Sequence, residues 1–394
     1  NRPTARNRPT ARNRPTARNR PTASRAILPG SFVRAYSLSG PIHCRFSVPS
    51  AKMAILASSN HLVRAPATAG PAWRQALRTA VRDPLELCRR LRLPAECANA
   101  AIRASRRFPV LAPTSYIARM EPGNPCDPLL RQVLPQDDEL TAATGFTADP
   151  VGDLAAQRAS GLLHKYLGRA LMITTGACAV HCRYCFRREY PYAPSPAVGS
   201  RWSGAIAEIA RDPSLEEVIL SGGDPLTLGD AGLADLAKTL ARIPHVRRLR
   251  VHTRLPIMIP ERVTEELVAW LRGTRLTPVV VVQANHPREL DASVAAALGR
   301  LADAGIPLLN QAVLLRGVND DLDTLVELSQ RLVDCRVMPY YLHQLDRVAG
   351  ASHFEAPVET GQRLIQGLTA RLPGYAVPRY VREVPGAASK QPIA

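Results

Sequence analysis

The chain has 394 residues, of which 46% are hydrophobic, and a formal net charge of +18 at pH 7, and this length allows one large core or two moderate ones. Only 5% of its residues are aromatic, which argues against an iron-sulfur or zinc module that binds nucleic acid through basic and aromatic side chains. The sequence has no run of about 18 apolar residues, so we expect no membrane span and no membrane partner.

Residues 1–52 form a basic, repetitive segment. They contain ten Arg and one Lys without any Asp or Glu, so they carry 11 of the 18 net charges and leave +7 for the rest of the chain. The repeat NRPTAR fills 1–22 and has no apolar period that could form a packed face. We predict that this segment is disordered and interpret it as translated upstream DNA, with Met53 as the native start. A transit peptide or a basic nucleic-acid-binding arm is the functional alternative.

Residues 53–168 are expected to form a helical and irregular N-terminal region. From 71 to about 107 apolar residues recur at helical spacing, and Asp83 followed by Pro84 indicates that one helix stops there and another begins. Between 109 and 163 the chain is rich in Pro, Gly and Asp. This composition predicts ordered irregular structure without a definite helix or strand.

Residues 169–350 alternate short β-rich runs with amphipathic stretches of helix length, which is typical of a parallel sheet with crossover helices. The expected strands are 169–174, 218–221, 249–253, 279–283, 308–314 and 337–342. The expected helices are 202–211, 233–242, 260–272, 287–304, 322–333 and, in a C-terminal segment of 351–394, 358–371. Six βα units predict an α/β fold, a partial (β/α)6 barrel. In such barrels the chemistry lies at the carboxyl ends of the strands.

Three cysteines follow the first of these strands in the sequence GACAVHCRYCFRR. Cys178, Cys182 and Cys185 have the spacing C-x3-C-x2-C. Three thiolates on one loop can hold three irons of a 4Fe–4S cluster and leave the fourth iron without a protein ligand, so we predict such a cluster. The alternatives are a zinc site with His181 as fourth ligand, or three buried free cysteines. Only three of eight cysteines cluster, a pattern typical of a metal site in a reducing cytoplasm rather than a disulfide framework. We therefore predict a cytoplasmic protein.

The sequence resembles the radical SAM (S-adenosylmethionine) superfamily and, within it, the lysine 2,3-aminomutase family. The resemblance spans 109–390 and is carried, in order, by GNPCDPLLRQVLP, GLLHKY, the cysteine triplet with CFRR, SGGDPL, NHPREL, NQAVLLRGVND, MPYYLHQLD and VPGAASK. It implies a 4Fe–4S cluster whose open iron is chelated by SAM. It further implies that Ser221, Gly222, Gly223 and Asp224, in SGGDPL, hold the SAM amino group. Without the resemblance a Gly-Gly-Asp turn is equally compatible with a plain loop.

The resemblance also implies pyridoxal 5′-phosphate (PLP) and points to the lysine that binds it. The chain has only four lysines: Lys52, Lys165, Lys238 and Lys390. From position alone Lys390 is a surface residue near the C-terminus, but VPGAASK matches the family loop that delivers the PLP lysine, with Ala and Ser replacing some glycines. The same matching assigns Arg169 to the PLP phosphate, for which a guanidinium is suited, and Gln311 to a second cofactor contact.

Three further residues match substrate-binding positions of the family. Arg187 corresponds to the arginine that pairs with the substrate carboxylate, although an exposed pair with Arg188 is the alternative. Asp346 corresponds to the carboxylate that binds the distant ammonium of lysine, and Glu383 falls where lysine enzymes have a second acid. Two anions favour a cationic side chain over that of glutamate.

The resemblance implies that an electron from the cluster splits SAM and that the 5′-deoxyadenosyl radical moves the amino group of lysine from the α to the β carbon. Glu383 replaces an Asp of the free-lysine enzymes, Gln283 replaces a frequent His, and the sequence ends soon after Lys390. The short tail after Lys390 favours the branch that makes (R)-β-lysine for elongation factor P. The alternatives are a catabolic free-lysine aminomutase and a radical SAM protein without PLP. The expected partners are lysine, a flavodoxin or ferredoxin as electron donor, and elongation factor P with its lysyl ligase; formation of a homo-oligomer is compatible with this assignment.

Overall fold

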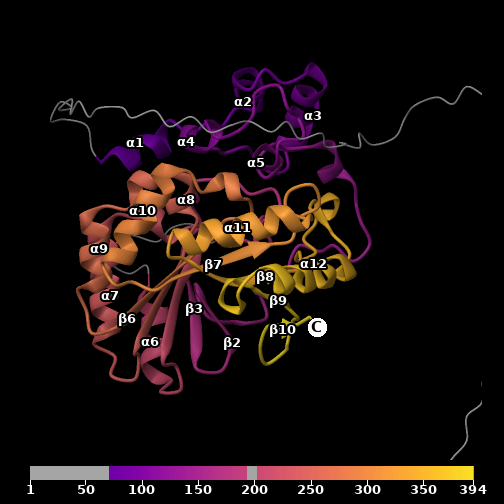
Figure 1. Ribbon diagram of the computed structural model, residues 1–394. Helices are drawn as coiled ribbons and strands as arrows, with labels where there is room; N and C mark the ends of the chain where they lie inside the picture. Colours follow the sequence, from indigo (N-terminus) through magenta and orange to yellow (C-terminus); the bar gives the residue numbers. More distant parts are fainter. Residues whose placement is uncertain (1–70, 193–201, 394) are drawn as a thin grey trace, which may run out of the picture. The chain divides into compact units, whose positions relative to one another are not determined.

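A single sheet forms the centre of the computed structural model, which describes residues 71–192 and 202–393 (Figure 1). Within these residues the sheet has ten strands, and their order in space follows their order in the chain. The repeat, the predicted disorder of 1–52 and the proposed start at Met53 lie outside the described residues.

Seven neighbouring strands of this sheet are parallel. They are β3 Arg169–Thr175, β4 Glu217–Gly222, β5 Arg248–His252, β6 Thr277–Val282, β7 Leu308–Val313, β8 Met338–His343 and β9 Arg379–Arg382. The predicted α/β fold and its six strands are confirmed, and β9 is an addition. The sequence of β9, RYVR, gives too short an apolar signal to be recognised, although Tyr380 and Val381 are buried.

Antiparallel strands extend both edges of the parallel sheet. At one edge β1 Gln157–Ala159 pairs with β2 Leu162–Tyr166, which in turn pairs with β3. At the other edge β10 Gln391–Pro392 folds back onto β9. The residues just before β10 are thereby fixed to the sheet rather than left as a tail.

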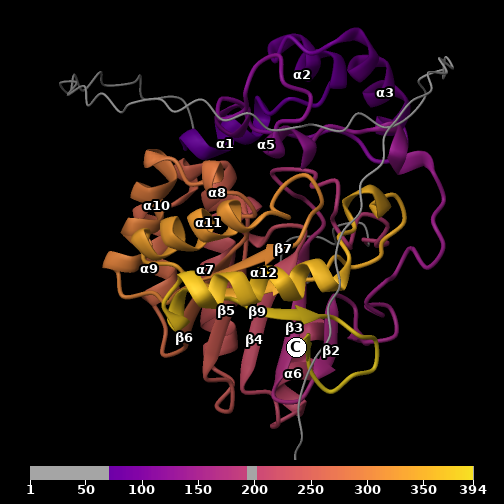
Figure 2. The ribbon, with the colours of Figure 1, turned by 45° about the vertical axis from the view of Figure 1, so that its right-hand side comes forward.

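Helices lie outside the sheet and pack on its outer face (Figures 1 and 2). They are α6 Ser203–Arg211, α7 Asp230–Ala241, α8 Leu255–Met258, α9 Glu265–Arg272, α10 Ala292–Asp303, α11 Leu322–Asp334 and α12 Val358–Arg371. The starts predicted at 260 and 287 are wrong, because those turns are the separate 3-10 helices η3 Pro260–Arg262 and η4 Pro287–Glu289. The α-helices begin only after Thr264 and Asp291, whose side chains cap Leu267 N and Val294 N.

The N-terminal region contains short helices. They are α1 Ala72–Arg78, α2 Pro84–Arg90, α3 Ala95–Ser105, α4 Thr114–Ile117, α5 Pro128–Arg131 and the 3-10 helix η1 Asp137–Leu140. The predicted break at Asp83 is confirmed, since its side chain accepts from Leu85 N as the cap of α2. Gln132 and Glu139 of this region bond to Arg254 and Arg183, which follow β5 and β3. The region therefore covers the carboxyl ends of the strands.

The strands direct alternate side chains to opposite faces. In β3, Ala170 and Met172 are buried in the core shared with the helices, while Arg169 and Leu171 face a cavity inside the curved sheet. Polar side chains therefore point inward from a sheet whose outer face is apolar. Among the described residues, none of the helices combines the length and apolarity needed to cross a lipid bilayer.

Candidate active site

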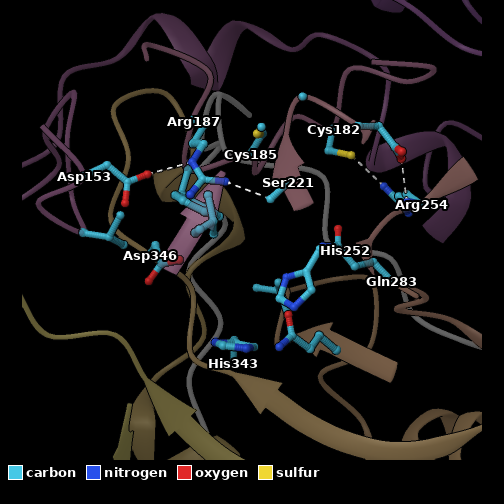
Figure 3. A pocket seen from close by; sticks show the side chains of 18 of the residues that line it. Asp153, Cys182, Cys185, Arg187, Ser221, His252, Arg254, Gln283, His343 and Asp346 are labelled. Atoms are coloured by element: carbon cyan, nitrogen blue, oxygen red, sulfur yellow. Dashed lines mark hydrogen bonds and ion pairs between the residues drawn. The ribbon is translucent and has the colours of Figure 1, made fainter. Parts of the chain in front are cut away.

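The inner face of the sheet lines a cavity of about 720 Å³ (Figure 3). All of the candidate site residues from the sequence line it. They are Cys178, Cys182, Cys185, Ser221, Gly222, Gly223, Asp224, Arg169, Gln311, Arg187, Asp346, Glu383 and Lys390. Residues that are up to 221 positions apart in the chain, Arg169 and Lys390, are thus brought to one space.

The cysteine loop leaves β3 at its carboxyl end. Cys178, Cys182 and Cys185 are free thiols, and burial raises the pKa of Cys185 to about 11. Within the described residues no three His, Cys, Asp or Glu side chains form a ready-made metal-binding group. The three thiols thus share a wall of the cavity without converging on one point. A 4Fe–4S cluster needs no such point, because each thiolate binds a different iron.

A glycine turn packs directly against the cysteine loop. Gly222 has φ +122°, and a Cβ on Gly223 would lie only 2.2 Å from the backbone oxygen of Ala177. Only glycine allows so close an approach. The Asp224 carboxylate is used within the fold, because it accepts hydrogen bonds from Thr253 Oγ1 and Arg254 N, both at 2.7 Å. Asp224 therefore shapes the turn that Ser221 and the two glycines present to the cavity.

Lys390 is held at the end of a hairpin. The pairing of β9 with β10 places Gln391 opposite Arg382, and the Lys390 Nζ donates to Glu383 Oε2 at 2.5 Å. Glu383 also accepts from Tyr166 Oη at 2.5 Å. Burial is the largest single influence and opposes ionisation of Glu383, but the charge of Lys390 and the hydrogen bonds from Lys390 and Tyr166 together lower the pKa of Glu383 to about 2.

Arg187 is tied to a carboxylate that sequence reasoning missed. Its Nε donates to Asp153 Oδ2 at 2.7 Å, and its Nη1 donates to Ser221 Oγ at 3.2 Å (Figure 3). Lys165 Nζ lies 2.6 Å from the other Asp153 oxygen and 3.6 Å from Glu383 Oε1. The alternative of an exposed Arg pair is wrong, since Arg187 is buried and the Arg188 side chain is fully covered and bonded to Glu139.

Asp346 differs from the other acids of the cavity. Within the described part of the chain its carboxylate has no hydrogen-bond partner, and burial raises its pKa to about 7 although the nearby charge of Lys390 opposes this. A carboxylate without a partner in a covered cavity is suited to a cationic ligand.

The remaining wall carries polar side chains from the middle of the barrel. Arg169 lies 4.7 Å from the centre of the Tyr166 ring, and Gln311 projects from β7. His252, Gln283 and His343 were not selected as ligands but lie together beside this wall (Figure 3). Burial lowers the pKa of His343 to about 3, and His252 Nε2 is buried with no partner in the described structure. His252 and His343 are the last residues of β5 and β8, whose alternate side chains point into the cavity. This position at the end of a predicted strand could have identified both histidines from the sequence.

A family model described as the radical SAM superfamily matches residues 172–328. An Escherichia coli protein named L-lysine 2,3-aminomutase is 46% identical over 322 residues, which are 82% of this chain and 94% of the relative. The protein of that name from Haemophilus influenzae is 44% identical, and the match covers 81% of this chain and 94% of the relative. The one from Clostridium subterminale is 35% identical, and the match covers 82% of this chain and 77% of the relative. The chain belongs to the lysine 2,3-aminomutase family of radical SAM enzymes.

Lysine 2,3-aminomutases are isomerases that use a 4Fe–4S cluster, SAM and PLP. The donor groups of this aminomutase are chemically suited to all three. Free thiols and the close-packed glycine turn form one wall of the cavity, and an amine and an arginine suited to PLP stand elsewhere on the same cavity. The family assignment and the geometry therefore agree on one shared reaction space.

Proposed function

We propose that this chain converts L-α-lysine to (R)-β-lysine and depends on PLP. The observation that carries the proposal is one cavity of about 720 Å³. The cysteine loop, Lys390 and the carboxylate of Asp346 all line it. When bound, the cluster with SAM would supply the radical, and PLP would supply the π-system that lets the amino group migrate from the α to the β carbon.

In this proposal Cys178, Cys182 and Cys185 hold the cluster, and Lys390 holds PLP. Arg169 binds the PLP phosphate, because its guanidinium lies over the Tyr166 ring and pairs with no acid among the described residues. Gln311 is the second PLP contact. Ser221, Gly222 and Gly223 present the turn for the SAM amino group, and Asp224 keeps that turn in shape.

The substrate is held at both ends by residues of opposite charge. Arg187, oriented by Asp153 and Ser221, binds the carboxylate, and Asp346 binds the side-chain ammonium. Glu383 is already paired with Lys390 and with Tyr166. We therefore assign Glu383 mainly to holding the Lys390 amine and leave Asp346 as the main determinant of the lysine side chain.

Anaerobic assay of the reconstituted protein tests this function. The enzyme is incubated with SAM, PLP, a one-electron reductant and either L-lysine or L-glutamate, and the products are separated by chiral chromatography. We expect (R)-β-lysine from lysine and no β-glutamate, because Asp346 repels a second carboxylate. Formation of β-glutamate, or no amino migration in protein that carries both cofactors, contradicts the proposal.

We further propose that the β-lysine serves elongation factor P, with a flavodoxin or ferredoxin as donor. The support is that Glu383 stands where the free-lysine enzymes carry Asp, and that Gln283 stands at a position that is often His. A strain without this gene should lack β-lysyl-modified elongation factor P, and β-lysine should restore the modification. Normal modification together with a growth defect on lysine as carbon source would favour the catabolic alternative.

A further inference from the structure

A buried polar network lies between the N-terminal region and the carboxyl ends of the strands. Three of its members, Gln132, Asn285 and Glu289, come from two sequence motifs to which the proposed function gives no role, GNPCDPLLRQVLP and NHPREL, and the fourth, Tyr184, belongs to the cysteine loop. Gln132 Nε2 donates to Glu289 Oε1 at 2.9 Å, and Asn285 Nδ2 donates to Gln132 Oε1 at 3.0 Å and to Tyr184 Oη at 2.6 Å. All four side chains are buried.

Arg254 connects this network to the cysteine loop. Its Nη2 donates to Gln132 Oε1 at 2.6 Å and to Glu289 Oε2 at 3.0 Å, while its Nη1 lies 2.8 Å from Cys182 Sγ (Figure 3). The backbone N–H of Arg254 is bound by Asp224 at 2.7 Å. Hydrogen bonds therefore hold Arg254 both at its backbone N–H and at its guanidinium, and they direct Nη1 at the sulfur of Cys182.

The charge of this guanidinium is permanent, because arginine stays protonated in proteins. Arg254 is only 4% exposed, so water screens its field little. Hydrogen bonds to ligating sulfurs and fixed charges nearby set the reduction potential of an iron-sulfur cluster. A cation beside the sulfur favours the reduced cluster, which carries one more negative charge.

We propose that Arg254 is a positioning residue that donates to Cys182 in the loaded enzyme and raises the reduction potential of the cluster, with Glu289 moderating its charge. The inference rests on the proposed ligation by Cys182. The electron comes from a one-electron reductant, one electron enters the cluster, and no proton moves with it. Arg254 stays charged before and after the step, so its field acts only on the cluster charge.

The test is an anaerobic dithionite titration of the reconstituted holoenzyme, in which the midpoint potential of the cluster is followed by EPR. Arg254→Gln removes the charge and should lower the midpoint potential, and Arg254→Lys should give a smaller shift in the same direction. The matched control is Arg262→Gln. Arg262 is also buried, pairs with Asp230 at 2.8 Å and lies 4.5 Å from the centre of the Trp73 ring, but it contacts no cysteine. Its loss should leave the potential unchanged.

Glu289→Gln provides the opposite sign and still applies if Arg254→Gln fails to fold. It keeps Arg254 and removes the neighbouring negative charge, so the midpoint potential should rise. If the network has only a structural role, the midpoint potentials of Arg254→Gln and Glu289→Gln will shift in the same direction or will not shift. Either result overturns the proposal. β-Lysine formation is measured on the same wild-type preparation. Opposite shifts without β-lysine would refute the proposed function alone, whereas β-lysine with unchanged potentials would refute the role of Arg254 alone.

Discussion

Lys390 Nζ donates to Glu383 Oε2 across the loop end of the hairpin that β9 and β10 form. The pair joins a run of alternating charges, because Glu383 also lies 3.6 Å from Lys165, and Lys165 and Arg187 both bind Asp153. This arrangement fixes a residue only four positions from the end of the sequence inside the cavity. It leaves the amine in reach of a cofactor and holds it at a defined place.

Replacing Lys390 should affect PLP binding and leave the iron-sulfur cluster intact. Lys390→Ala should abolish β-lysine formation, to below about one thousandth of wild type, while the iron content and the cluster EPR signal stay normal. Lys238→Ala removes the same side chain from the exposed face of α7 and should have no effect. Retained β-lysine formation in Lys390→Ala would exclude Lys390 as the PLP lysine.

Replacing a cluster ligand should give the reverse result. Cys182→Ala removes one of the three thiolates, so the cluster should be lost, whereas the absorbance band of bound PLP should persist. Cys335→Ala serves as control, because Cys335 is a free thiol outside the cavity. A full complement of four irons in Cys182→Ala would count against the ligand assignment.

The affinity for lysine should depend on pH through Asp346. Its pKa is raised to about 7 by burial, so the carboxyl is neutral below pH 7 and anionic above it. We expect kcat/KM for lysine to rise between pH 6 and 8, and Asp346→Asn to raise KM by about 10- to 100-fold and to remove this rise. An unchanged pH profile in the variant would assign the ammonium to another acid.

The ion pair of Glu383 should stabilise the fold at neutral pH. Its folded-state pKa, about 2, lies below the ordinary value of 4.5, so the stabilisation is complete above about pH 5 and is lost as the pH falls from 4.5 toward 2. We expect Glu383→Gln to lower the free energy of unfolding by on the order of 2 kcal/mol at pH 7. Denaturation at pH 7 and pH 3 should show this difference shrink, and a difference that grows in acid would contradict the assignment.

The glycine turn offers a test by stability and metal content together. A Cβ on Gly223 would meet backbone atoms of Ala177 at 2.2 Å, so Gly223→Ala should cost roughly 2–4 kcal/mol and impair cluster assembly. Gly232→Ala places the same methyl in open space within α7 and should be neutral or stabilising by up to about 1 kcal/mol. Chemical denaturation and iron analysis of both variants provide the comparison.

The sequence was most informative where chemistry and periodicity coincide. The strands β3 to β8 have strong apolar runs, and the cysteine spacing has few other meanings, so both were predictable. The strand β9 was missed because its four residues, RYVR, are too few to show the alternation of apolar and polar residues that marks a strand. Asp153 lies in irregular chain and Lys165 in the edge strand β2, and both were missed because their role comes from contact with Arg187 and Glu383, which are distant in the sequence. The helix starts at 260 and 287 were misplaced because prolines there open separate 3-10 turns.

The central claim is that a cluster held by the cysteine loop and PLP held by Lys390 share one cavity. The most direct measurement is borohydride reduction of the anaerobically reconstituted, iron-loaded protein, which fixes PLP to the amine that carries it, followed by peptide mass spectrometry. Our account predicts the pyridoxyl group on Lys390 in protein that also contains four irons per chain. Modification of Lys165 or Lys238 in place of Lys390, or iron-loaded protein without any pyridoxyl group, would contradict it.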